Sequence, residues 1–171
     1  WLSRLSNWTR ARELLGESAA LFREVGDLRG LGRALSYLAA DAGDLEQSKA
    51  LWEESLVHLR AADDAVGATW TLDRLGVIAH WRGDFRRARA LFEESLALSR
   101  GLGHRRGIAL ALGDLGNLAM SEGDYDRARE LIEDSLALAR EIGDELNIRW
   151  RLFHLGTLAR FEGQIAEARA L

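Results

Sequence analysis

The chain has 171 residues, 47% of them hydrophobic, and a net charge of −4. The absence of cysteine excludes disulfides and thiolate-bound metals, and the interleaving of acidic with basic residues argues against nucleic-acid binding. No apolar run approaches the roughly 20 residues that a membrane helix needs. The sequence starts at Trp1, without an initiator Met or a signal-peptide pattern. We therefore expect a fragment of a longer cytoplasmic protein that contacts neither nucleic acid nor membrane.

Apolar residues recur at intervals of three and four along the chain, which is the spacing of amphipathic helices. Proline is absent, and pairs such as Gly83-Asp84 separate the segments, because Gly favours the left-handed turn after a helix and Asp caps the next helix. No sustained alternation with period two occurs, so no strand is expected. The predicted helices are 7–25, 28–42, 45–61, 64–82, 84–101, 104–122, 124–142, 144–162 and a stub from 164.

One stretch recurs every forty residues: Gly123 to Leu131 matches 83–91, 43–51 and 163–171. A fixed period of this size is typical of stacked helical repeats. The sequence therefore predicts an all-α fold in one repeat array. Its units are a partial first unit at 1–25, repeats at 26–61, 62–101 and 102–142, and a truncated last hairpin at 143–171.

Two irregularities and a set of small residues refine this map. Gly26 and Gly43 are only 17 positions apart, so helix 28–42 should be about one turn short, and Asp63 occupies a turn position that Gly fills elsewhere. Small residues are expected where the paired helices touch, and Trp8 and Trp52 are expected in the core. The small residues are Gly76, Gly116 and Gly156 on one helix and Ala88, Ala128 and Ala168 on its partner.

The skeleton Leu115-Gly116, Ala119, Gly123, Tyr125 and Ala128 resembles the tetratricopeptide repeat, and similar skeletons cover the whole chain. The period of forty is longer than that family's usual length, and its helix-ending Pro is missing. The longer form resembles arrays in bacterial signalling ATPases and in transcriptional regulators of the maltose-regulon activator class. The resemblance implies a right-handed superhelical solenoid of antiparallel hairpins whose first helices line a concave groove.

No arrangement of residues predicts catalysis or a bound metal or cofactor. The four His lack metal-ligand spacing, and the Gly motif at 113–116 has neither a preceding strand nor a following Gly-Lys-Ser/Thr. Carboxylate pairs such as Glu93-Glu94 recur with the repeat, as a solvated face does and a catalytic pair does not. We therefore predict a binding module rather than an enzyme.

The candidate binding residues are those on first helices that differ between the copies. Residues that pack every repeat in the same way share one constraint and stay alike, whereas residues that line the groove do not share it. They combine aromatic anchors with polar groups, a mixture typical of recognition surfaces. These residues are Arg33, Tyr37, Trp70, Asp73, His80, Trp81, Asn117, Trp150, Phe153 and Arg160.

Several alternatives remain open at this stage. Trp70 and Trp150 fit equally well as residues that pack on the preceding hairpin. A protein or peptide in the groove is the expected partner, but a small-molecule sensor with a pocket near Trp70, His80 and Trp150, or a plain spacer, fits the same pattern. Because neither end carries the polar cap that a solenoid needs, end-to-end self-association is also expected.

Overall fold

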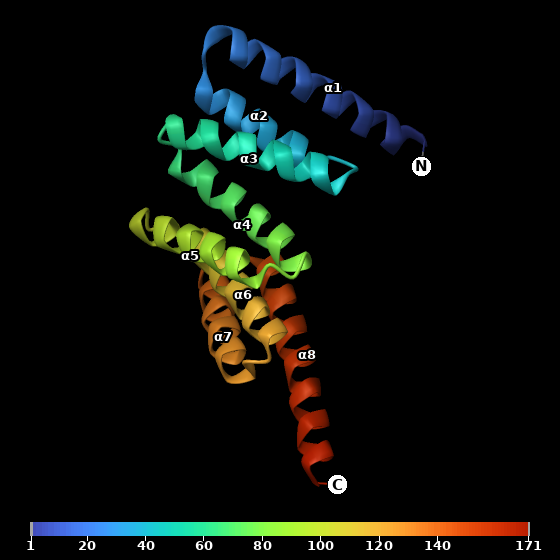
Figure 1. Ribbon diagram of the computed structural model, residues 1–171, viewed down its shortest axis with the longest axis vertical. Coiled ribbons are helices and arrows are strands. Elements are labelled where there is room, and N and C mark those ends of the chain that lie inside the picture. Colours follow the sequence, from blue (N-terminus) through green and yellow to red (C-terminus); the bar gives the residue numbers. More distant parts are fainter. Residues whose placement is uncertain (1, 171) are drawn as a thin grey trace. The chain divides into compact units, whose positions relative to one another are not determined.

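A computed structural model describes the backbone of residues 2–170 and the side chains of residues 9–163, and over this range the chain is all-α, without strands (Figure 1). The chain divides into two compact units, Trp1–Leu75 and Gly76–Leu171, so α4 contributes to both. No described helix is long and apolar enough to span a membrane. The helices are α1 (Leu2–Val25), α2 (Leu28–Ala40), α3 (Leu45–Ala61), α4 (Ala65–Trp81), α5 (Phe85–Gly101), α6 (Arg105–Glu122), α7 (Tyr125–Glu141) and α8 (Glu145–Ala170).

In the first unit, α2 and α3 pack side by side as a hairpin, and α1 packs against α2 (Figure 1). Leu31 and Leu35 of α2 form a buried cluster with Ala19 of α1. Trp52 of α3 is buried, which confirms its predicted place in the core, whereas the side chain of Trp8 lies outside the described range. The first unit is therefore held by the apolar faces that the helical spacing predicts.

In the second unit, α6 packs against both α5 and α7, and α7 packs against α8. A Cβ added at Gly116 would lie 2.6 Å from Cγ1 of Ile132, and one added at Gly76 would collide with the ring of Phe92. Both glycines thus allow close helix contact, as predicted. A Cβ added at Gly156 would meet no atom of another element within 4 Å, so the described residues show no such role for it. Ala168 lies outside the range of described side chains.

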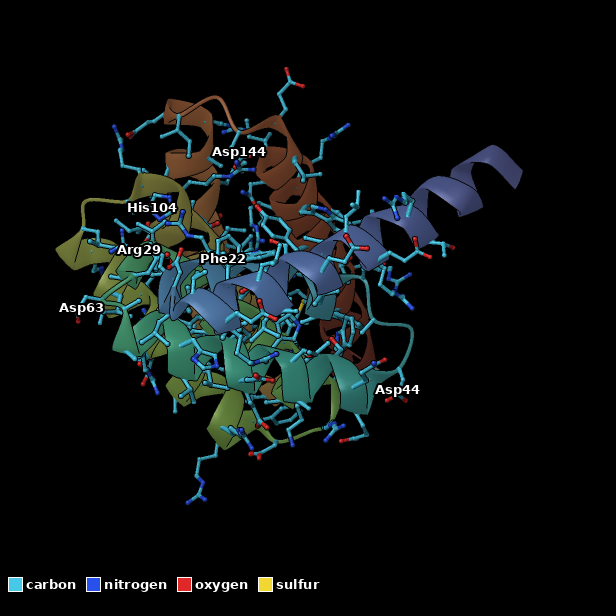
Figure 2. The ribbon with its side chains drawn as sticks, turned by 90° about the horizontal axis from the view of Figure 1, so that it is seen from above. Phe22, Arg29, Asp44, Asp63, His104 and Asp144 are labelled. Carbon is cyan, nitrogen blue, oxygen red and sulfur yellow. The ribbon has the colours of Figure 1, made fainter. Side chains whose placement is uncertain are left out.

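In most of the turns a left-handed Gly follows one helix and an Asp caps the next, as expected. The left-handed glycines have φ between 62° and 84°, and they are Gly26, Gly83, Gly103, Gly123 and Gly143. The Asp that begins the next helix accepts a hydrogen bond from the backbone N–H three residues on, as Asp44 does from Gln47 at 2.8 Å. Asp63 takes a φ of 51° without being Gly. Figure 2 labels Asp44, Asp63, His104 and Asp144, which lie at turns of their respective units.

Three expectations about helix bounds were wrong. The helix expected from residue 7 already begins at Leu2. Gly43 is not left-handed: α2 has only 13 residues and ends at Ala40, so Gly43 lies in a longer turn instead of directly after the helix. The helix expected to stop near 162 continues to Ala170 as a single 26-residue helix. Gly163 is followed by Gln164, a residue without the short side chain that caps a helix start, so nothing local favours a new helix there.

Candidate functional site

In the first unit, two of the predicted binding residues lie close together. The ring of Tyr37 lies 5.6 Å from that of Trp70, and Trp70 contacts the buried Trp52 edge-on at 4.9 Å. Trp70 is thus packed on the preceding hairpin, which was the alternative interpretation, while Tyr37 remains 58% exposed. Among the described side chains of this unit, Tyr37 is therefore the exposed aromatic one.

Arg33 is fixed in orientation by an ion pair. Its Nε donates to Oδ2 of Asp64 at 2.6 Å, and the backbone N–H of Gly67 donates to the other carboxylate oxygen. Burial opposes ionisation of Asp64, but the hydrogen bonds from Arg33 and Gly67 outweigh it and lower the pKa of the carboxyl group. Asp73 was predicted to face the groove, but it is only 1% exposed, so its carboxylate does not lie at the surface.

A cavity of about 390 Å³ opens between α1 and α2, and we call it the first-unit cavity. Phe22 and Leu15 of α1 supply apolar wall, while Arg29, Arg33 and Tyr37 follow one another at four-residue intervals along α2. Arg29 also donates to the backbone oxygen of Ala62 at 3.2 Å. Phe22 and Arg29 are labelled in Figure 2. This cavity thus brings two predicted residues, Arg33 and Tyr37, onto one face.

A second cavity of about 250 Å³, the second-unit cavity, unites three other predicted residues: His80, Trp81 and Asn117. Nε2 of His80 lies 2.8 Å from Oγ of Ser121, which also donates to the backbone oxygen of Asn117. Trp81 is 75% exposed at this site. The remaining lining residues are Val77 of α4, Phe92 of α5, Asp114, Met120 and Ser121 of α6, and His154 of α8.

Behind this cavity lies a buried arginine that the sequence analysis missed. Arg151 is 4% exposed, and its Nη2 lies 3.8 Å from Oδ1 of Asp114. A Cβ at Gly113 would collide with the guanidinium group, so the absence of a side chain there makes room for Arg151. Burial lowers the pKa of Arg151, and Asp114 opposes that effect. Burial, followed by the nearby charge of Arg151, lowers the pKa of His154 to about 4.

A sequence signal for Arg151 existed. Forty residues earlier the chain has Ala111, and forty before that Thr71, both buried. A charged residue at a packing position of the repeat therefore indicated an unusual local arrangement. No group of described His, Cys, Asp and Glu residues could hold a metal ion.

The predicted residues of α8 do not line the second-unit cavity. Trp150 and Phe153 are exposed and contact each other edge-on at 6.0 Å, while Arg160 lies over the ring of Phe161 at 5.7 Å. Phe153 corresponds to Gly113 of α6 forty residues earlier, a position that α8 covers. Its exposure therefore reflects the lack of a helix on this face of α8 among the described residues.

Residues 107–171 match a family model of the tetratricopeptide repeat, and residues 69–102 match a second model of the same repeat. The chain therefore contains tetratricopeptide repeats over these residues. Repeats of this kind typically form non-catalytic scaffolds or sensor modules for protein interaction. The match over residues 107–171 confirms the resemblance seen in the skeleton around Gly116.

Solved structures show the same fold at low sequence identity, whereas no curated protein matches the sequence. BtubC from P. vanneervenii is 20% identical with a TM-score of 0.80, and the match covers 98% of this tetratricopeptide-repeat chain and 71% of that one. A signal transduction ATPase with numerous domains and a tetratricopeptide-repeat sensor, from Pyrococcus horikoshii, is 14% identical (TM-score 0.71; 98% of this chain, 29% of that one). A putative kinesin light chain with repeats of this kind, from Podosopora anserina, is 16% identical (TM-score 0.64; 98% and 84%).

Proposed function

We propose that this chain is a non-catalytic module that binds a protein or peptide through the first helices of its hairpins. The observation that carries the proposal is the placement of exposed aromatic rings. Among the described side chains these rings are Tyr37, Trp81, Trp150 and Phe153, all on α2, α4 or α8. The second helices α3, α5 and α7 have no exposed aromatic side chain in the described range. Large aromatic side chains at a surface are typical anchors for a partner.

A regulatory setting is the finer part of the proposal. The signal transduction ATPase from Pyrococcus horikoshii, which has a tetratricopeptide-repeat sensor, shares the fold of this chain. The forty-residue period resembles arrays in bacterial regulators of the maltose-regulon activator class. Both support a cytoplasmic sensor or scaffold arm of a larger regulatory protein. The test is made on a longer protein that contains this chain. Partner binding to the repeats should change the activity of the regulatory domain in that protein, and an unchanged activity would contradict the proposal.

The binding surface can be tested with peptides selected from a random display library against the whole chain. Tyr37→Ala and Trp81→Ala should each weaken binding of at least one selected peptide about tenfold or more, as truncation of an aromatic anchor does. Val57→Ala is the matched control, because Val57 is an exposed apolar residue on the second helix α3. Loss of binding in Val57→Ala alone, with both aromatic variants unchanged, would contradict the proposal.

A small-molecule sensor is the second candidate, and the first-unit cavity favours it. Its volume of about 390 Å³ falls within the roughly 300–1,000 Å³ of ligand pockets. Arg29, Arg33 and Tyr37 supply convergent polar groups on one wall. In that case binding measured by calorimetry should depend on Arg29 and Tyr37 and should be unaffected by Trp81→Ala.

A further inference from the structure

We propose that the second-unit cavity binds one basic side chain, Lys or Arg, of the partner. This inference rests on the proposed function, since it names the chemistry of one group that the partner presents to the first helices. It follows from the size of the cavity, the charge of its wall and the side chains at its rim.

The size of the cavity suits a single side chain. Its volume of about 250 Å³ lies below the roughly 300–1,000 Å³ that is usual for small-molecule sites. Val77, Phe92 and Met120 give it apolar walls. The methylene stem of Lys or Arg buries itself along such a surface while its charged head reaches a polar group.

Among the lining residues of the cavity, Asp114 is the group that is negatively charged at neutral pH, and its carboxylate also faces the buried Arg151. The ionisable lining residues are His80, Asp114 and His154. Burial lowers the pKa of both histidines, so both are neutral near pH 7 and the carboxylate of Asp114 remains the charged group of the lining. Asn117 adds a second acceptor, because its Oδ1 is buried and has no hydrogen-bond partner among the described residues. Two acceptors with one negative charge match the donors of an ammonium or guanidinium group.

Trp81 supplies the third element of a cation site. Its indole is exposed and belongs to the lining. The face of Trp attracts a cation more strongly than that of the other aromatic residues. A basic head between Trp81 and Asp114 would therefore meet both a carboxylate and an aromatic ring.

Arg151 is the feature that would instead favour an anion. Its guanidinium group is buried, does not line the cavity, and stays beyond hydrogen-bond distance of Asp114, with Nη2 at 3.8 Å from Oδ1. A carboxylate offers several lone-pair directions. Asp114 can therefore accept from a ligand on the cavity side while Arg151 stays behind it.

The test uses acetylated pentapeptides, Ala-Ala-X-Ala-Ala-amide, titrated into the whole ¹⁵N-labelled chain and followed by NMR. With X as Arg or Lys, the indole signal of Trp81 and the amide signals of Asn117 and Ser121 should shift in a saturable way. Norleucine, which keeps the stem without the charge, and Glu should give no saturable shift there. Equal binding of Arg and norleucine, stronger binding of Glu, or no shift with either basic peptide would each overturn the proposal.

Variants locate the site. Trp81→Ala should weaken binding about two- to fivefold, the ratio that corresponds to an exposed cation–π contact, and Asn117→Ala should weaken it about tenfold. Val57→Ala is the control, because Val57 is an exposed apolar residue of the second helix α3 and does not line the cavity. Shifts of the Tyr37 and Trp150 signals with no shift at Asn117 would refute the cavity site and leave the proposed function standing.

Discussion

Arg151 is unusual among the repeat positions, because it places a charged group in a helix-packing interface. Repeat positions of this kind hold Thr71 and Ala111 in the other copies, where no charge has to leave water. A buried guanidinium is costly unless it is well paired, and Asp114 lies 3.8 Å from it. Removing the side chain of Arg151 or of Asp114 should therefore affect folding as well as binding.

The His154 side chain should make stability depend on pH in a defined window. Its pKa is about 4 in the folded chain against 6.5 as the ordinary value, so the unfolded chain binds the extra proton more readily. The free energy of unfolding should be highest above about pH 6.5, fall as the pH decreases toward about 4, and change little through this group below that. Protonation of Asp64 and Asp144, whose pKa values are lowered from 3.8, removes further stability at still lower pH.

Urea unfolding at a series of pH values checks this prediction. In His154→Gln the fall in unfolding free energy between about pH 6.5 and 4 should be smaller than in the unmodified chain. An identical fall in both proteins would show that His154 does not contribute.

At the scale of helices, the packing contacts and surface ion pairs both repeat with the sequence. Arg89 of α5 pairs with Glu122 of α6, and forty residues on, Arg129 of α7 pairs with Glu162 of α8. Exposed ion pairs of this kind contribute little, about 0–1 kcal/mol each. The stability of a hairpin must therefore come mainly from its close apolar contacts, such as Gly116 against Ile132.

Gly116→Leu should accordingly destabilise the chain by roughly 1–3 kcal/mol or more, the cost of overpacking. A Cβ there would already lie 2.6 Å from Ile132 and 3.2 Å from the backbone oxygen of Ala128, which cannot easily move. Gly101→Leu is the control, because Gly101 is the last residue of α5 and a Cβ added there would meet no atom within 4 Å. It should change the free energy of unfolding by about 0.5 kcal/mol or less. Equal melting shifts in the two variants would refute the packing argument.

The elements were predictable where local rules act alone. Helical spacing and the Gly-Asp turns correctly placed the starts of all seven helices from α2 to α8 within one residue. The spacing of Gly26 and Gly43 correctly predicted that α2 is short. The end of α8 was not predictable from the repeat, because Gly163 acts as a stop only if a following helix packs back. The prediction for Gly43 was wrong for a related reason. Because α2 ends at Ala40, Gly43 does not occupy the position directly after the helix, where a left-handed residue is needed.

At the scale of the whole molecule, the forty-residue period identified the repeat family but could not identify the contacts that make a site. His80, Trp81 and Asn117 were found because they differ between copies, and they do share a cavity. Asp114 and His154 were missed because a helical pattern does not reveal which polar residues on a packed face meet across helices. The right-handed superhelix and the boundaries of the units at 1–25, 26–61, 62–101, 102–142 and 143–171 stay predictions.

Self-association is the last prediction at this scale. The exposed apolar side chains of α8 are large and close in sequence: Leu146, Trp150, Leu152 and Phe153. Gly113, which precedes Phe153 by forty residues, is covered by Arg151 of α8, so the face of α8 that carries Phe153 corresponds to one that packs in α6. Exposed apolar faces of this kind favour association. The 171-residue chain should therefore sediment as larger species as its concentration rises.

Phe153→Glu should shift that equilibrium toward the monomer, because a carboxylate placed in an apolar contact must be desolvated. Trp81→Glu is the matched control, since Trp81 is also aromatic and exposed but lies on α4 and not on α8. Sedimentation velocity should then show association in the control and in the unmodified chain, and much less in Phe153→Glu. A strictly monomeric profile of the unmodified chain at high concentration would exclude association through this face, and an equal loss in both variants would assign it to general surface charge.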